Sequence, residues 1–187
     1  MLNFRTAELI ATFLGLGWSR LCPGTLGSVA TLPLWFLIMS LVKYFELQSP
    51  MLFMALAILV LFFLALRAVD IYLKKKGDPA YDPPEVIADE IIGQLLSFFL
   101  SLLIIASLGK VGLDLMQESY GYMLYIFGFV TPVVFFRIFD IWKPGIIGII
   151  DSKMKNALGI MLDDVVAGFL AGLTNLLLFR VVWAFIR

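Results

Sequence analysis

The longest apolar stretches of the chain set the strongest limit on its fold. Five of them come close to the roughly 20 residues that a helix needs to cross a bilayer, and they cover residues 29–47, 51–69, 91–108, 122–139 and 165–186. Hydrophobic residues make up 61% of the 187 residues, against roughly 45–50% in soluble domains. The sequence therefore predicts one all-α membrane domain over residues 1–187, a polytopic membrane protein with about five transmembrane helices.

The first residues predict a further, shorter helix. Residues 2–17 contain an apolar run, but Arg5 and Glu8 interrupt it, and it is too short for a span. We expect a short N-terminal helix that lies at the membrane interface or is half inserted.

The distribution of Lys and Arg predicts the orientation. If the chain crosses the membrane at every predicted span, one side receives most of the basic residues, namely Arg5, Arg20, Arg67, Lys74, Lys75, Lys76, Arg137, Lys143, Lys153 and Lys155. The other side receives Lys43, Lys110 and Arg187, with Arg180 nearer that end. Cytoplasmic loops carry the excess of positive charge, so the first side is predicted to face the cytoplasm.

Four polar motifs lie at the predicted cytoplasmic ends of the spans. They are Cys22-Pro-Gly-Thr-Leu-Gly-Ser28, Ile87-Ala-Asp-Glu90, Phe136-Arg-Ile-Phe-Asp-Ile-Trp-Lys-Pro144 and Gly159-Ile-Met-Leu-Asp-Asp164. A carboxylate near the centre of a bilayer costs about 2.5–3.5 kcal/mol on insertion scales. A chain that gathers acids, an Arg and a Lys at one membrane face is therefore predicted to hold a metal or a phosphate there.

Two acidic pairs, Asp89-Glu90 and Asp163-Asp164, are each predicted to open an apolar helix. Acids in a first turn are favoured by the helix dipole, so helix capping is the competing interpretation. Small residues follow each pair and would let the two helices approach closely; they are Gly93 and Ala167-Gly168. Together with Asp140 the pairs could share a divalent cation, and a carboxylate site without histidine suits Mg²⁺ or Mn²⁺ better than zinc.

The third motif combines both charges on one predicted helix face. Arg137, Asp140 and Lys143 follow each other at intervals of three residues, a spacing that places them side by side on a helix. An ion pair within the helix, with a snorkelling Lys, is the simpler interpretation. In the alternative, Asp140 binds a metal while Arg137 and Lys143 hold phosphate oxygens.

The first motif is predicted to be a glycine-containing turn before a span. Successive N–H groups at a helix start favour an anion. A cysteine phosphatase is excluded, because that chemistry needs an Arg six residues after the cysteine and Ser28 is found there.

Composition removes several other classes of function. The formal net charge is zero, so nucleic acid is not an expected partner. The chain has no histidine, so no histidine can act as base, nucleophile or metal ligand. Its one cysteine leaves no partner for an intrachain disulfide.

Taken in order, these motifs make the chain resemble the phosphatidylglycerophosphatase A family. The resemblance covers most of the chain, from Ala11-Thr-Phe13 and Pro23-Gly-Thr-x-Gly-Ser28 through the two acidic pairs to Ala167-Gly168. It departs from the family pattern at Ile146 and at Asn156-Ala157, in the predicted loop 145–158.

The resemblance implies a Mg²⁺-dependent phosphatase of a bacterial-type inner membrane, with its active site facing the cytoplasm. Its substrate would be phosphatidylglycerophosphate, which it would hydrolyse to phosphatidylglycerol and phosphate. Carried over by position, the catalytic and metal-binding residues are Asp89, Glu90, Asp140, Asp163 and Asp164, and the phosphate-binding residues are Arg137, Lys143 and Thr25. The nucleophile is either water or one carboxylate, and the sequence leaves the oligomeric state open.

A cation- or proton-coupled transporter is the main alternative, because acids inside a membrane often mark an ion route. Such a route needs polar groups at mid-span, and residues 56–66 and 98–106 are apolar apart from Ser101. A phospholipid-forming phosphotransferase is disfavoured because its Asp-x-x-Asp-Gly-x-x-Ala-Arg pattern is absent. A purely structural membrane protein would not need clustered acidic pairs.

Overall fold

The computed structural model describes residues 2–20, 22–77, 82–107 and 121–186. Within these ranges the chain is helical and contains no strand. The longer helices are α2 (Pro23–Tyr44), α3 (Pro50–Lys76), α4 (Ala88–Ser107), α7 (Thr131–Trp142) and α9 (Ala157–Ile186). The shorter ones are α1 (Phe4–Ala11), η1 (Leu16–Trp18), α6 (Gly121–Tyr125), η3 (Ile126–Val130) and α8 (Ile146–Lys153). The predicted all-α fold is confirmed for the described residues.

Three described helices are long and apolar enough to cross a membrane, namely Pro23–Tyr44, Pro50–Lys76 and Ala157–Phe185. The expected count of about five spans is not confirmed. The expected span 91–108 falls on α4, except for residue 108, which lies outside the described residues. The expected span 122–139 is helical too, but it is divided among α6, the π-helical η3 and α7.

Two predicted helix starts are wrong. Helix α9 begins at Ala157, so Asp163 and Asp164 lie in its second turn instead of opening it. The predicted turn after Cys22 is already helical, because α2 begins at Pro23. Proline at the first helical position is favoured, and the hydroxyl of Ser28 donates back to the carbonyl of Gly24 at 3.2 Å.

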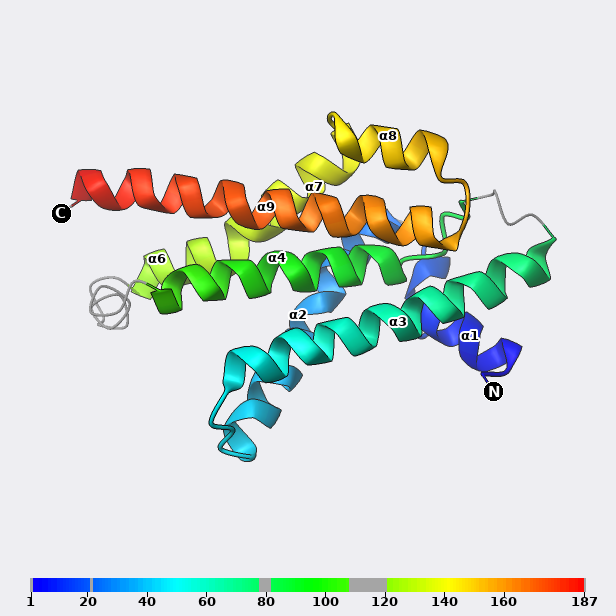
Figure 1. The fold of residues 1–187 in the computed structure, drawn as a ribbon, viewed down its shortest axis with the longest axis horizontal. Coiled ribbons are helices and arrows are strands. Elements are labelled where there is room, and N and C mark those ends of the chain that lie inside the picture. The colour runs from blue at the N-terminus through cyan, green and yellow to red at the C-terminus, as the bar shows by residue number, and fades with distance from the viewer. Residues whose placement is uncertain (1, 21, 78–81, 108–120, 187) are drawn as a thin grey trace.

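The long helices lie side by side. Helices α4 and α9 run along the long axis of the molecule, α3 lies on one side of this pair, and α8 lies beside the first half of α9 (Figure 1). Helix α1 lies near the C-terminal end of α3 (Figure 1). The N-termini of α4 and α9 and the C-terminus of α3 thus come to the same end of the bundle, as the predicted topology requires.

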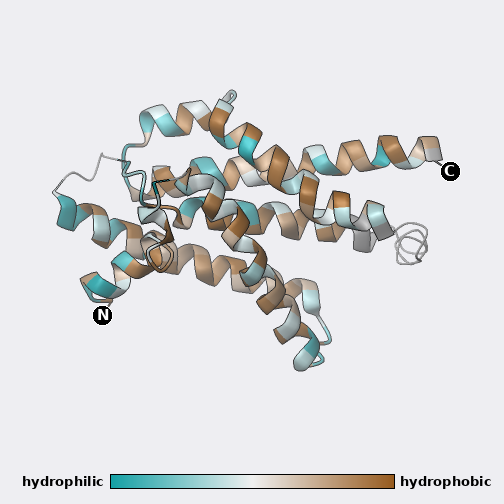
Figure 2. Cartoon of the chain, turned by 180° about the vertical axis from the view of Figure 1, so that it is seen from behind, coloured by the Kyte–Doolittle hydropathy of each residue, from teal (hydrophilic) through white to brown (hydrophobic). Residues whose placement is uncertain are grey.

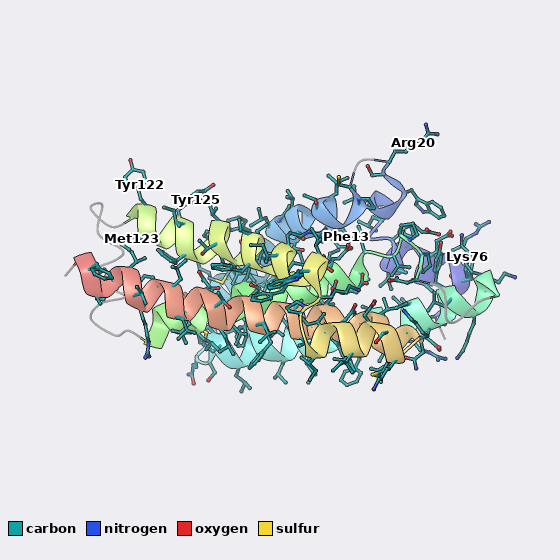
Figure 3. The ribbon with its side chains drawn as sticks, turned by 90° about the horizontal axis from the view of Figure 1, so that it is seen from above. Phe13, Arg20, Lys76, Tyr122, Met123 and Tyr125 are labelled. Carbon is teal, nitrogen blue, oxygen red and sulfur yellow. The ribbon has the colours of Figure 1, made fainter. Side chains whose placement is uncertain are left out.

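The outer surface is largely apolar, as expected for helices in lipid. Large side chains such as Phe36, Phe63 and Leu177 are more than half exposed, which a soluble monomer rarely tolerates over a wide area. Hydrophobic residues dominate the middle of the long helices (Figure 2). Lys76 and Arg20 lie toward one end of the bundle, while Tyr122 and Tyr125 lie toward the opposite end (Figure 3). Lys110 and Arg187, predicted for that opposite side, lie outside the described residues.

A buried polar network connects helices in the half of the bundle away from the N-termini of α4 and α9. Pro132 has no N–H to donate, and the π-helical segment η3 precedes it. The side-chain amide of Asn175 donates to the carbonyl of Phe127 in η3 at 2.7 Å and to the hydroxyl of Ser101 at 2.8 Å. The hydroxyl of Thr131 donates to the side-chain oxygen of Asn175. Helices α4, η3, α7 and α9 are therefore joined at this level.

Candidate active site

The acid-bearing helix ends surround one cavity of about 280 Å³. It is lined by Asp82, Asp89, Glu90, Asp140, Lys143, Asp163 and Asp164, together with Pro23, Pro83, Pro84 and Val86. All five carboxylates named from the sequence therefore meet in one place, although they come from α4, α7 and α9. The capping interpretation does not account for this convergence, and for Asp163 and Asp164 it fails because they are not in a first turn.

Close contact between α4 and α9 brings the two acidic pairs together. A Cβ on Gly93 would lie 2.5 Å from the carbonyl oxygen of Asp164, and one on Gly168 would overlap the carbonyl oxygen of Gly93. Small residues of this kind let membrane helices approach until their backbones touch. Asp89 and Asp164 are both less than one-tenth exposed as a result.

Arg137 links two of the acids. Its guanidinium forms an ion pair with Asp140, three residues along α7, and reaches Glu90 Oε1 of α4 at 3.8 Å. Gly24 of α2 packs against this group, because a Cβ there would lie 2.9 Å from Arg137 Nη1 and would overlap Glu90 Oε1. The expected pair within α7 is therefore present, and the glycine motif serves to bring the start of α2 onto it.

Lys143 follows the last residue of α7 in a left-handed conformation, with φ of 47°. Its ammonium donates to Asp163 Oδ2 and to Asp151 Oδ1, each at 2.7 Å. Burial alone would lower the pKa of Lys143, but the hydrogen bonds to Asp151 and Asp163 outweigh it and raise the pKa above its usual value. Lys143 therefore carries a positive charge at the cavity.

The cations do not reach every acid. Arg137 pairs with Glu90 and Asp140, and Lys143 pairs with Asp151 and Asp163. Among the described ion pairs none involves Asp89 or Asp164. Three buried carboxylate oxygens also have no hydrogen-bond partner among the described residues: Asp89 Oδ1, Glu90 Oε2 and Asp164 Oδ2. A buried carboxylate without a partner is costly, so these oxygens are suited to bind a cation that comes from outside the chain.

The donors are of the type that Mg²⁺ prefers, since all are carboxylate oxygens. In the described part of the chain, however, no three acidic or cysteine side chains are already close enough together to hold one metal ion. The ion pairs of Arg137 and Lys143 draw Asp140 and Asp163 toward the cations. Several carboxylates can share an ion here only if their side chains rotate toward the same point of the cavity.

Two residues of this site were missed by the sequence prediction. Asp82 lines the cavity; loss of water around its carboxyl group raises its pKa, and the nearby Lys143 opposes this shift. Asp151 holds Lys143 from α8. The Pro83-Pro84 pair, which restricts the backbone between Asp82 and Asp89, was the sequence feature that could have indicated that Asp82 lies near the other acids. Asp151 lay in a segment expected to be a loop, and it carried no such signal.

Thr25 differs from the other predicted residues. It lies in the first turn of α2, but it is exposed and is not among the residues that line the cavity. Its predicted contact with phosphate therefore has no support from its position.

Comparison with known proteins gives a family match over nearly the whole chain. Residues 9–179 match the family model described as Phosphatidylglycerophosphatase A. A protein of that name from Escherichia coli K12 is 28% identical over 164 residues, 88% of this chain and 78% of the relative. Another from Haemophilus influenzae is 32% identical over 169 residues, 88% of this chain and 83% of the relative.

A third relative has a different name. A Bacteroides thetaiotaomicron protein, provisionally named a phosphatidylinositol-3-phosphatase, is 30% identical over 165 residues, 86% of this chain and 85% of the relative. No solved structure matches the chain significantly.

Proposed function

The chain belongs to the phosphatidylglycerophosphatase A family, and we propose that it hydrolyses phosphatidylglycerophosphate to phosphatidylglycerol and phosphate with the help of Mg²⁺. It is thus an enzyme, a phosphatase. The observation that carries the proposal is the single cavity in which the five predicted acids meet Lys143, with Arg137 directly behind Glu90 and Asp140.

The substrate phosphate needs positive charge, and the site offers two side chains that supply it. The guanidinium of Arg137 can hold two phosphate oxygens at once, whereas Lys143 acts as a point charge. In both cases the phosphate would take the place of a carboxylate that now accepts the hydrogen bond. The positive charge then acts on the transferred group, where it stabilises the transition state most.

Mg²⁺ fits the remaining acids. The residues that would hold it are Asp89, Glu90, Asp140, Asp163 and Asp164, of which Asp89 and Asp164 have no cation of the chain beside them. When bound, it would neutralise phosphate charge and stabilise an attacking or leaving oxygen.

In the reaction, an oxygen nucleophile forms a new bond to phosphorus as the ester bond to the glycerol oxygen breaks. That glycerol oxygen takes up a proton and leaves as the hydroxyl of phosphatidylglycerol. The nucleophile is water or a carboxylate; if a carboxylate attacks, a water molecule must then hydrolyse the acyl phosphate to release phosphate and restore the carboxylate. Because the chain contains no histidine, a carboxylate of the cavity is the expected general base.

The position of the acid cavity at one end of the bundle suggests how the protein lies in the membrane. We place the cavity at the cytoplasmic face of a bacterial inner membrane, since Arg20, Lys76, Lys143 and Lys153 belong to the basic side predicted from the sequence. Helix α4 and residues 121–142 would complete five spans. Helix α1 would lie at the interface, with Leu9 about half exposed on its surface. The acyl chains of the substrate would then remain in the bilayer while the head group enters the cavity.

A transporter is not favoured. The chain belongs to a phosphatase family, and the mid-span polar groups Ser101 and Asn175 bond to each other instead of lining a described cavity.

The test is phosphate release by the purified full-length protein in detergent from synthetic phosphatidylglycerophosphate, with Mg²⁺ and then with chelator. We expect release that stops when the metal is removed. Phosphatidylinositol 3-phosphate, the substrate class in the third relative's name, serves as the comparison lipid. Release from that lipid alone would reassign the substrate, and release from neither lipid would contradict the proposal.

A further inference from the structure

Asp151 contacts Lys143 from outside the acid cavity. It lies on α8 and is about one-third exposed, with its Oδ1 atom 2.7 Å from the Lys143 ammonium. It is not among the residues that line the cavity, and instead borders a small neighbouring pocket with Asp82, Lys155 and Asn156. Asp151 is therefore a partner of Lys143 without being positioned to touch a substrate in the cavity.

Helix α8 is fixed against Lys143 by its backbone as well. A Cβ on Gly148 would lie 2.7 Å from the carbonyl oxygen of Lys143, so the helix turns back directly onto this residue. Ile147 anchors α8 because it is fully buried in a cluster with Phe136 and Ala167. Packing therefore holds the backbone of α8, from which Asp151 projects, against Lys143.

The two carboxylates that hold Lys143 have different surroundings. Asp163 lines the cavity together with the other acids, and its side chain is 6% exposed, whereas Asp151 is about one-third exposed and is not among the residues that line the cavity. If Asp163 turns toward Mg²⁺, as the proposed function requires, Lys143 loses one of its two partners. Asp151 is the partner that stays.

We propose that Asp151 is the positioning residue for Lys143: it holds the ammonium at the edge of the acid cavity, so that Lys143 meets the substrate phosphate when Asp163 has turned to the metal. This inference rests on the proposed function, since it assigns Lys143 to the phosphate. Asp151 itself touches no reacting atom and acts through Lys143.

A purely structural role is the competing explanation. An ion pair between two partly exposed side chains contributes little to stability, and its loss would change the folded fraction slightly and leave the turnover of the folded enzyme unchanged. A positioning role predicts the reverse, with a large effect on turnover at nearly constant stability. The two explanations therefore differ in what a double-mutant cycle on activity would measure.

The experiment compares Asp151→Asn, Asp151→Glu, Lys143→Met and the double variant Asp151→Asn/Lys143→Met, as full-length proteins in detergent. We expect Asp151→Asn to lower kcat/KM about tenfold, because the amide oxygen still accepts from the ammonium but lacks the charge that makes such a hydrogen bond roughly twice as strong. Asp151→Glu should recover part of the activity because the charge remains. The double variant should be no worse than Lys143→Met within about twofold, since residues that act as one unit are not additive.

Asp70→Asn is the matched control. Asp70 also forms ion pairs with two cations, Arg67 and Lys74, but on the surface of α3. The same chemical change should leave kcat/KM within about twofold of the wild type.

Binding of inorganic phosphate, measured by calorimetry, gives a readout that does not depend on turnover. We expect Asp151→Asn and Lys143→Met to weaken phosphate binding to a similar extent. If the wild type binds phosphate but hydrolyses no phosphatidylglycerophosphate, the proposed substrate fails while the role of Asp151 is still decided by these affinities. If Asp151→Asn matches the wild type in both assays, or if its losses multiply with those of Lys143→Met, Asp151 does not act through Lys143. Absence of both hydrolysis and phosphate binding in the wild type would overturn both proposals.

Discussion

Gly168 of α9 packs directly onto the backbone of Gly93 in α4, so closely that a Cβ on Gly168 would overlap the Gly93 carbonyl oxygen. Gly93 lies one turn after Asp89 and Glu90, and Gly168 lies one turn after Asp164. The contact therefore sets how far apart the two acidic pairs stand. The geometry of the site depends on two residues that carry no functional group.

Gly168→Ala should accordingly damage both stability and activity. The added methyl group must push α9 away from α4, and overpacking of this kind costs about 1–3 kcal/mol in the free energy of unfolding. Displacing acidic groups by even about 1 Å can lower turnover about 100-fold. Thermal unfolding in detergent and phosphate release from the lipid would measure the two effects.

Phe169→Ala is the control for this change, since Phe169 is the next residue of α9 and is about half exposed. It should leave turnover nearly unchanged. Wild-type activity in Gly168→Ala would mean that the helix contact does not set the geometry of the site.

Neutralising Asp89 or Asp164 should affect stability differently from neutralising the acids that pair with Arg137 or Lys143. In chelator, Asp89→Asn or Asp164→Asn should raise the Tm of the protein, because a buried carboxylate without a cation is replaced by a neutral group. Each kcal/mol corresponds to about 2–4 °C for a chain of this size. Both variants should lose most phosphate release.

Addition of Mg²⁺ completes this prediction. A ligand that binds the native state at about 100 times its Kd stabilises it by about 2.7 kcal/mol, so Mg²⁺ should raise the Tm of the wild type. The two Asn variants should show little or no such rise. An equal rise in wild type and variants would place the cation elsewhere.

The sequence predicted which acids would come together better than it predicted the helix boundaries. Carboxylates are costly inside a bilayer, so acids at the ends of apolar stretches are expected at the membrane surface. Asp89, Asp140 and Asp164 could therefore be predicted to lie at the same membrane face without knowledge of the packing.

The boundaries of α2 and α9 depended on local contacts that hydropathy does not report. Helix α9 begins at Ala157 because the side-chain oxygen of Asn156 caps it and accepts a hydrogen bond from the Gly159 N–H at 2.9 Å. Gly159 also lets this first turn lie against the carbonyl of Met154, where a side chain would not fit.

Of the carboxylates that pair with Arg137 and Lys143, only Asp140 could be predicted as a partner from the sequence. Arg137 and Asp140 share a helix face, so their pairing was predictable from spacing. Lys143 lies past the helix end in a left-handed conformation, which turns its side chain away from that face and toward Asp151 and Asp163. The contact between Asp151 and Lys143 could be identified only from the structure, because it depends on how α8 packs against Lys143.

Arg137→Lys should be strongly impaired although it keeps the charge. The guanidinium contacts carboxylates on two helices, Glu90 on α4 and Asp140 on α7, and a Lys ammonium lacks the planar fork that serves two acceptors at once. Loss of one preorganised donor to a developing charge lowers kcat about 100- to 1,000-fold. Steady-state kinetics on the lipid would measure this, and a loss of less than about tenfold would remove Arg137 from the phosphate site.

Asn175→Ala should lower stability without touching the acid cavity. It removes the amide that bonds Phe127 and Ser101 and accepts from Thr131. Hydrogen bonds between membrane helices contribute about 0.6 kcal/mol on average and up to about 1.7 kcal/mol, so a loss of about 1–2 kcal/mol is expected for this network. Thr174→Ala, at the neighbouring position of α9, serves as the control in thermal unfolding. An equal Tm for both variants would show that the network adds no stability.

The contacts of Glu85 should make the stability of the protein depend on pH, independently of the acids in the cavity. It accepts a hydrogen bond from the Tyr72 hydroxyl at 2.8 Å and pairs with Lys76 at 3.2 Å. Burial alone would raise the pKa of Glu85, but its backbone hydrogen bond, Tyr72 and Lys76 together lower it below the usual value. A lowered native pKa means that the contact stabilises the protein above the unfolded pKa of about 4.3, and that this stabilisation is lost as the pH falls through the native pKa.

The difference in Tm between wild type and Glu85→Gln should therefore be constant near neutral pH and shrink as the solution is acidified below about pH 5. Tyr72→Phe removes one of the groups that lower the pKa of Glu85, so in that background the Glu85→Gln difference should disappear at a less acidic pH. Thermal unfolding over this pH range tests both statements. A Glu85→Gln difference that stayed the same into acid would mean that the carboxylate charge contributes nothing to the contact.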